Sequence, residues 1–315
     1  MGLAKRWRRA GACGLLALAG CAGLRTGGET APVAPPAAAG DWLTAPARRL
    51  SDSSADQTAP SFSPDGATLI YQNNADGNWE LYRLGLADGR ALRITDTPEA
   101  EEDPSLSPDG RWIVCTVHAP TLEADAPREI LLMSPEGKDR HVIAASGADD
   151  WLPRFTPDSR AVLFVSDRVD DRRDQADEQR LTAIFSYSLE NDSLSQLTEP
   201  GRFSAPLPVA TGAGLRLDDH RLGWLGPAGL ETALVDTTRI LGQPDWQAEA
   251  GWVAMALTPD QDGRLLVRAP QSGEWMELPL EGREADRLPA WSPDGRALAF
   301  SGRSGGQWDL FIRSR

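Results

Sequence analysis

The chain of 315 residues carries 46 acidic and 32 basic side chains, a formal net charge of −14, and 41% of its residues are hydrophobic. This length and apolar content are sufficient for one large domain with its own core. The acidic balance disfavours nucleic acid as a partner and electrostatic adsorption to an anionic membrane, because both surfaces are negatively charged.

Residues 1–20 are predicted to be a secretory signal peptide. Four basic residues precede an apolar stretch over residues 10–20, which is too short to cross a bilayer. The stretch ends in Leu18-Ala19-Gly20-Cys21, which resembles the lipobox of bacterial lipoproteins, where small residues precede a cysteine that is lipidated. The resemblance implies that Cys21 is the lipid attachment site. The alternative is an ordinary signal peptide with an incidental cysteine.

Residues 21–44 are predicted to be an extended tether. They repeat Pro and Ala and contain few large apolar side chains, so they cannot build a core. The residue after Cys21 is Ala22, where Asp is expected for retention in the inner membrane, so the lipoprotein resemblance implies anchoring at the periplasmic face of the outer membrane.

A four-residue turn motif organises the remainder of the chain. In Ser-Pro-Asp-Gly, the Pro presets φ, the Asp can accept a hydrogen bond from the backbone two residues on, and the Gly accepts positive φ, so the motif closes a tight hairpin turn. An apolar alternating run follows each copy, and further runs complete four predicted strands per unit. The copies are Ser63–Gly66, Ser107–Gly110, the weaker Thr156–Ser159, and Ser292–Gly295.

Repeated four-stranded units predict an all-β fold, a six-bladed β-propeller of four-stranded antiparallel blades over residues 45–315. The last unit contains three strands, and residues 47–51 resemble the closing strands of the other units. We therefore predict that residues 47–51 complete the last blade and close the ring, which removes an open sheet edge. The predicted blades are residues 56–97, 101–146, 149–200, 203–243, 245–283 and 286–315.

The fourth and fifth units depart from the repeat. The fourth has no Pro-Asp turn, and its strands are expected at 221–225, 231–235 and 239–241. The fifth keeps Thr258-Pro259-Asp260, which is expected to be its hairpin turn, with strands at 265–267 and 275–278.

The repeat also resembles a known family. The pattern Pro-x-aromatic-Ser-Pro-Asp-Gly, followed by Trp-(Glu/Asp)-Leu-(Tyr/Phe), is similar to the WD40-like Pro-Asp repeat (PD40) of TolB-like propellers over residues 45–200 and 285–315. The resemblance implies a six-bladed propeller but no single function, since the same repeat builds the propeller of prolyl oligopeptidase-type peptidases.

The residues do not suggest a catalytic centre. The Gly-x-Ser-x-Gly spacing occurs at Gly302–Gly306, but these residues lie inside the last predicted blade and not in an α/β-hydrolase domain, where the motif forms a nucleophile elbow. The three histidines, His118, His141 and His220, are expected to fall in different units without metal-ligand spacing. Cys115 lies within a predicted strand and is expected to be a buried apolar residue. The sequence therefore predicts a protein without enzymatic activity, cofactor or metal centre.

Acidic residues precede the innermost strand of several units. If the register holds, Asp56, Glu101, Asp103, Asp150 and Asp286 ring one mouth of the central channel, where they would bind a cation or a basic segment of a partner. The alternative, which we favour, is that these acids cap turns and bond backbone amides between blades. A charged insertion over residues 170–180 is expected to project on the same face, as a solvated loop or a recognition element.

The resulting functional hypothesis is a monomeric, lipid-anchored propeller of the cell envelope that acts as a scaffold for a partner protein. Two alternatives of other classes remain open. One is an extracytoplasmic hydrolase or lyase, and the other is a propeller that binds a glycan or small ligand at the channel mouth.

Overall fold

The computed structural model describes most of residues 45–201, all of residues 275–314, and mainly the strands between these two stretches. Cys21, the tether, His220, and most of the charged insertion (residues 171–179) lie outside the described residues. The described residues are 45–119, 127–170, 180–201, 204–209, 212–218, 221–226, 229–235, 241–247, 252–257, 263–268 and 275–314.

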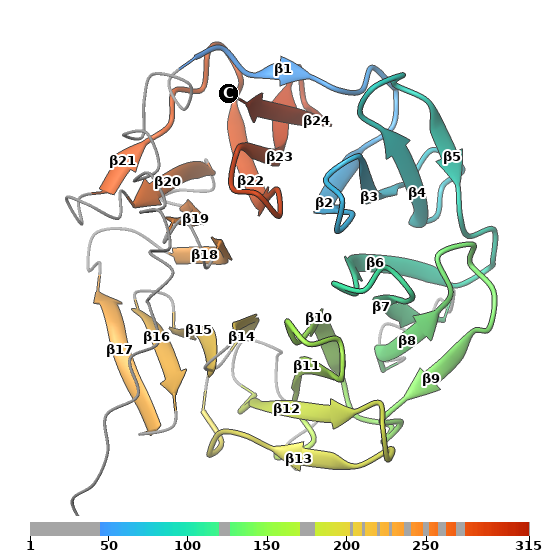
Figure 1. The fold of residues 1–315 in the computed structure, drawn as a ribbon, viewed down its shortest axis with the longest axis vertical. Coiled ribbons are helices and arrows are strands. Elements are labelled where there is room, and N and C mark those ends of the chain that lie inside the picture. The colour runs from blue at the N-terminus through green and yellow to red at the C-terminus, as the bar shows by residue number, and fades with distance from the viewer. Residues whose placement is uncertain are drawn as a thin grey trace, which may run out of the picture. The chain divides into compact units, whose positions relative to one another are not determined.

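The described strands form six four-stranded antiparallel sheets, and successive sheets contact one another through their first strands, so that the sheets are arranged in a ring (Figure 1). The predicted all-β propeller of four-stranded blades is therefore confirmed. The strands of the first three sheets are β2 (Gln57–Phe62), β3 (Thr68–Asn73), β4 (Glu80–Gly85) and β5 (Ala91–Arg93), then β6 (Ala100–Leu106), β7 (Ile113–His118), β8 (Glu129–Met133) and β9 (His141–Ile143), then β10 (Asp150–Phe155), β11 (Ala161–Ser166), β12 (Ala183–Ser188) and β13 (Leu194–Gln196).

The last sheet is closed by the N-terminal strand, as the sequence predicts. Strand β1 (Arg48–Arg49) pairs antiparallel with β24 (Gln307–Ser314), and β23 (Ala297–Ser304) and β22 (Ala285–Trp291) complete that sheet. The Arg49 guanidinium is 2.5 Å from the carboxylate of Asp309, whose side chain is fully buried. The closing strand therefore supplies a counter-charge as well as backbone hydrogen bonds.

In the fourth and fifth units, two of the strand assignments predicted from the sequence are wrong. Residue 241 is not the end of the fourth unit: it begins β18, the first strand of the next sheet. Residues 258–260 follow β19, the second strand of that sheet, rather than the first, although the turn itself is outside the described residues. These two sheets comprise β14 (Ser204–Val209), β15 (Gly212–Asp218), β16 (Arg221–Gly226) and β17 (Gly229–Val235), then β18 (Leu241–Gln247), β19 (Trp252–Leu257), β20 (Arg264–Arg268) and β21 (Trp275–Glu277).

The physical reason for both errors is an incomplete repeat pattern. Gly after the Asp is not decisive, because Thr156–Ser159 lacks it and still closes the first hairpin of the third sheet. The Thr258–Asp260 stretch instead has no proline four residues before Pro259 to mark an innermost strand, and the apolar run Trp252–Leu257 ahead of it forms the second strand. The expected strands near 265–267 and 275–278 are present as β20 and β21, but as the third and fourth strands of their sheet.

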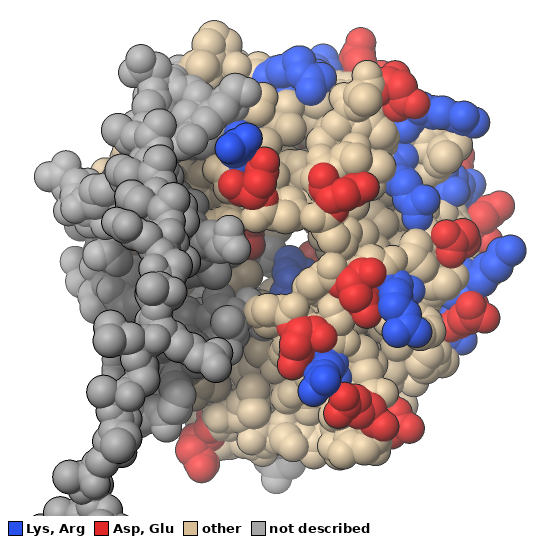
Figure 2. Space-filling view, in the orientation of Figure 1, with Lys and Arg blue, Asp and Glu red and all other residues tan. Residues whose placement is uncertain are grey.

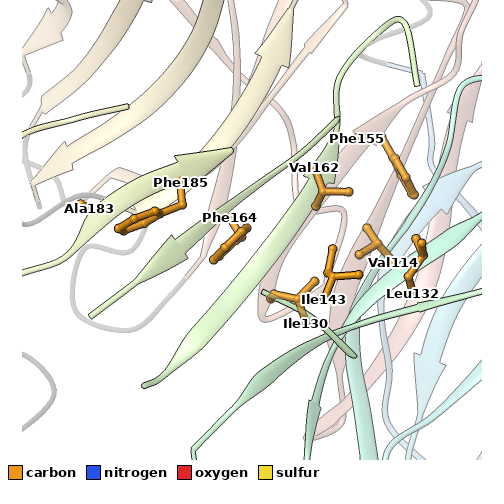
Figure 3. Packing of buried hydrophobic residues seen from close by; sticks show 9 residues of the cluster. All are labelled: Val114, Ile130, Leu132, Ile143, Phe155, Val162, Phe164, Ala183 and Phe185. Carbon is orange, nitrogen blue, oxygen red and sulfur yellow. The ribbon is translucent and has the colours of Figure 1, made fainter. Parts of the chain in front are cut away.

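The hydrophobic core lies between neighbouring sheets. One cluster joins side chains of the second sheet, such as Val114 and Ile130, to Phe155, Phe164 and Phe185 of the third sheet (Figure 3). Phe164 and Phe185 stack with their ring centroids 6.0 Å apart. Cys115 is buried as predicted, and burial raises the pKa of its thiol. Interlocking faces of this kind hold the blades in order around the channel.

The innermost strands share a bulge beside the channel. In four of them the ladder shifts register at a residue with positive φ that directly precedes a proline. Since proline has no N–H, it can occupy this bulge without losing a ladder bond. The residues with positive φ are Ala59 (55°), Asp103 (52°), Leu152 (54°) and Leu288 (52°).

Candidate functional site in the central channel

The central channel contains a cavity of about 260 Å³ lined by residues of all six innermost strands. Its charged lining includes Arg154 from β10 and Asp245 from β18. Asp103 from β6 interacts electrostatically with Arg154 and with Arg287 from β22. Two blades therefore place charges in the cavity lining, and two more place charges on innermost strands beside it.

Asp103 is the one predicted site residue whose carboxylate faces the channel charges without a hydrogen bond or ion pair among the described residues. Its backbone is held on both sides: the N–H donates to Gln72 Oε1 over 2.7 Å, and the carbonyl accepts from Arg154 Nη1 over 3.4 Å. Burial raises the pKa of the Asp103 carboxyl to about 6, although the charge of Arg154 acts in the opposite direction.

The two arginines differ in how they are held. Arg154 Nη1 donates to the carbonyl of Pro153 over 2.8 Å. Burial lowers the pKa of Arg154, and the charges of Asp103 and Asp245 oppose that effect. The Arg287 guanidinium lies 3.8 Å from the ring centroid of Trp308, an arrangement typical of a cation–π contact. Its pKa is also lowered by burial, with Asp56 and Asp103 opposing.

Three other predicted residues are buried in ion pairs. Glu101 accepts from Arg140 Nη2 over 2.5 Å, and Asp150 accepts from Arg168 Nη2 over 2.7 Å. Burial raises the pKa of both carboxyls, and the arginine contacts lower it. One oxygen of each carboxylate is therefore paired inside a blade, while Glu101 Oε2 and Asp150 Oδ1 are buried without a hydrogen-bond partner among the described residues.

Asp286 differs from Glu101 and Asp150 in that both of its carboxylate oxygens accept hydrogen bonds from one arginine. It accepts from Arg283 Nε over 2.6 Å and from Arg283 Nη2 over 2.9 Å. The same guanidinium lies 5.1 Å and 4.9 Å from the ring centroids of Phe300 and Phe311. Burial raises the pKa of Asp286, and Arg283 lowers it.

Backbone contacts add a link between blades at the same positions. The N–H groups of Glu101, Asp150 and Asp286 donate over 2.9 to 3.0 Å to carbonyls in the preceding blade. Each acceptor is the residue directly before the third strand of that blade: Trp79, Arg128 and Gly263. Asp56 also joins neighbours, since its Oδ1 accepts the N–H of Trp308 over 3.0 Å. These contacts are of the structural kind that the sequence offered as the alternative to a ring of free acids.

A second set of acids belongs to the Pro-Asp turns, which join the first and second strands of four sheets. Figure 2 shows acidic side chains around the hollow at the centre of the ring. In each turn the Asp carboxylate accepts a hydroxyl at 2.6 Å and a backbone N–H two residues on. These bonds lower the pKa of each carboxyl. For Asp65 the largest cause is the hydrogen bond from the Ser63 hydroxyl. The four exposed residues are Asp65, Asp109, Asp158 and Asp294.

His118 lies in β7 and His141 in β9, which belong to one sheet, so the expectation that these two histidines fall in different units is wrong. His118 Nε2 lies 3.2 Å from Glu102 Oε2, and the ring of His141 meets Trp112 edge to face. Among the described residues there is no group of three or more His, Cys, Asp or Glu side chains arranged to hold a metal ion. No helix in the described part of the chain is long and apolar enough to cross a membrane.

Arg154 and Arg287 were missed from the sequence, although a signal exists. When the innermost strands are aligned on their bulge prolines, Arg154 stands where the first two blades have Ser61 and Ser105. Arg287 stands where the first blade has Thr58. The remaining aligned blades have Ala290 at the first position and Glu102 and Trp151 at the second, so both positions vary and the arginines are set apart only by their positive charge.

Comparisons with known proteins agree with the fold. Residues 41–174 match the family model described as the TolB beta propeller domain, PD40. A protein TolB homolog of Chlorobium chlorochromatii is 28% identical over 109 residues, which is 35% of this chain and 23% of that protein. The chain thus spans about a quarter of the curated relatives it matches, and these are distant TolB homologues.

Two solved structures extend the likeness to most of the chain. Oligogalacturonate lyase from Vibrio parahaemolyticus superposes with a TM-score of 0.60 at 11% identity, covering 84% of this chain and 92% of the lyase. Regucalcin, a calcium-binding protein from Agrobacterium tumefaciens, gives 0.61 at 14% identity, covering 85% and 93%. At these identities the likeness establishes the propeller fold alone.

Proposed function

We propose that this chain, which carries the TolB-type propeller repeat, is a lipid-anchored, six-bladed propeller of the bacterial cell envelope that binds a partner protein at its channel and catalyses no reaction. Cys21 carries the lipid, residues 21–44 hold the propeller away from the membrane, and the propeller faces the periplasm from the outer membrane. The protein works as a monomer without a cofactor.

The observation that carries this proposal is the charged lining of the channel. The cavity is lined from all six innermost strands and includes Arg154 and Asp245. Charged groups on several rigid strands can fix the orientation of an inserted segment, because each is held by the backbone of a different blade. A cavity of about 260 Å³ admits a few side chains rather than a folded domain.

The test is a crosslinking pull-down from membranes with the native lipoprotein, a Cys21→Ala form that cannot be lipidated, and an Arg154→Ala channel form. We expect one discrete protein with the native bait, and much less with either variant. Arg160→Ala is the matched control, since Arg160 is an exposed arginine that pairs with Glu190 outside the channel.

The proposal is overturned if well-recovered native bait captures no protein. In that case the hydrolase or lyase hypothesis and the glycan or small-ligand hypothesis gain weight, and the channel is the place to screen. Equal capture by native and Arg154→Ala bait would place the partner elsewhere on the propeller.

A further inference from the structure

Two opposite charges on innermost strands, Asp103 on β6 and Arg287 on β22, have no ion-pair partner among the described residues. Neither the Asp103 carboxylate nor the Arg287 guanidinium forms a hydrogen bond or ion pair with any described residue. The contrast with other half-buried or buried charges is clear: Glu101, Asp150 and Asp286 all have arginine partners. A charge withdrawn from water and left unpaired lowers stability, so this arrangement calls for a reason.

Arg287 is oriented without being neutralised. The face of Trp308 holds its guanidinium at 3.8 Å, and its Nε–H is buried with no acceptor. Stacking on an aromatic ring leaves the edge of a guanidinium, with its N–H groups, free to meet a planar anion. A carboxylate is the group that matches this fork, since two parallel N–H···O bonds can form.

Asp103 offers the opposite charge from a different blade. Its φ of 52° at the bulge and the backbone bonds to Gln72 and Arg154 fix its position. The side chain is half-buried, and it interacts at longer range with the charges of Arg154 and Arg287. An ammonium or guanidinium group of a ligand would pair with this carboxylate at close range.

We propose that the channel binds a zwitterionic segment of a polypeptide, with a carboxylate of the segment on Arg287 and a neighbouring cationic group on Asp103. This inference rests on the proposed function and specifies the chemistry of the partner. A ligand with one charge would satisfy one channel group and leave the other unpaired, whereas a segment with both charges satisfies the two together.

The experiment titrates the full-length protein with four blocked peptides at low salt, by calorimetry. The peptides are acetyl-Ala-Lys-Glu-Ala-amide and its Lys-Gln, Gln-Glu and Gln-Gln forms. We expect the Lys-Glu peptide to bind about tenfold more tightly than either singly charged peptide, which is the scale of one charge-assisted bond. Free lysine and free glutamate form a further arm that separates a peptide ligand from a free amino acid.

Protein variants assign each charge. In Arg287→Gln the preference for Glu over Gln in the peptide should vanish while the preference for Lys remains. In Asp103→Asn the reverse should hold. Arg160→Gln and Glu190→Gln are controls, because these residues form an exposed ion pair away from Arg287 and Asp103, and both should behave as the native protein does.

Two results overturn the inference: equal binding of all four peptides, or a preference for Glu that survives in Arg287→Gln. Tighter binding of the free amino acids than of the peptides would overturn the polypeptide part. These outcomes are distinct from failure of the proposed function. If membranes yield the same partner with native and Arg287→Gln bait, partner binding stands and the zwitterion inference fails.

Discussion

The inner strands of this propeller carry two kinds of charge. Asp286 is buried, bonded twice by Arg283, and its partner lies against two phenylalanine rings. Asp103 occupies an innermost strand two blades away along the ring, yet its carboxylate has no ion pair within the part of the chain that the structure describes, and the same holds for the Arg287 guanidinium, which stacks on Trp308. The first kind joins elements within the protein, and the second is left for something outside it.

The comparison shows that an acidic residue at the entrance of a blade is not by itself a binding group. What separates the two kinds is whether an arginine of the same chain reaches the carboxylate. The predictions below test that distinction by removing one member of a pair or one unpaired charge.

The largest loss is expected from deletion of residues 45–52. The deletion exposes the edge of β24 and removes Arg49, which leaves the buried Asp309 without its counter-charge. We expect the free energy of unfolding in urea to fall by more than about 3 kcal/mol. Deletion of residues 30–37, in the predicted tether, is the control. An unchanged melting temperature after the 45–52 deletion would contradict ring closure by this strand.

A matched pair of substitutions four residues apart is the next test. Arg283→Met strands the carboxylate of Asp286 in the interior and should cost about 3 to 5 kcal/mol. Arg287→Met removes a guanidinium that has no ion pair and should cost less than about 1 kcal/mol or stabilise the protein. Urea midpoints measure both, and equal losses would erase the distinction between the two kinds of charge.

Asp103→Asn should stabilise the protein, but only above acidic pH. Burial raises the pKa of Asp103 to about 6, so the folded state favours the protonated form. The stability contributed by that form is present below pH 4 and is lost as pH rises through 6. At pH 8 the free energy of unfolding of Asp103→Asn should exceed that of the native protein by on the order of 2 kcal/mol. Near pH 4 the two proteins should be almost equally stable.

Four charged groups also act on the pKa of Asp103. They are Arg154, Glu102, Arg128 and Arg287, and the arginines act to lower the pKa while Glu102 acts to raise it. A stability difference between variant and native protein that is the same at pH 4 and pH 8 would show that Asp103 titrates normally.

The smallest effect is expected at the turns. Asp294→Ala removes the acceptor of the Ser292 hydroxyl and of the Arg296 N–H and should cost about 1 kcal/mol. Because hydrogen bonds lower the pKa of Asp294, this contribution is present at neutral pH and lost as pH falls below 4. If Asp294→Ala lowered the free energy of unfolding as much as Arg283→Met does, the turn bonds would be as important for stability as the buried ion pair, which would contradict the expected order of effects.

Much of the fold could be predicted because one local signal repeats. The Pro-Asp turns specify hairpins, and hairpins placed at regular intervals predict blades, including the closing strand at Arg48–Arg49. Where the repeat pattern is incomplete, the apolar pattern alone misplaced Leu241 and the Thr258–Asp260 stretch by one strand.

The site was less accessible to sequence reasoning. The positions of Glu101, Asp150 and Asp286 follow the repeat, but their partners do not: Arg140 precedes β9, Arg168 follows β11, and Arg283 precedes β22. No spacing rule connects these residues, since contacts across a blade depend on side-chain reach. Whether a carboxylate is free or paired could therefore be read only from the three-dimensional arrangement.

The most direct test of the distinction is a pair of double-mutant cycles on unfolding free energy at pH 8. One cycle combines Arg283→Met with Asp286→Asn, and the other combines Arg287→Met with Asp103→Asn. We predict a coupling energy above about 2 kcal/mol for the first cycle and below about 0.5 kcal/mol for the second. Coupling of similar size in both cycles would mean that Asp103 and Arg287 already neutralise each other, and it would contradict the claim that they are left for a ligand.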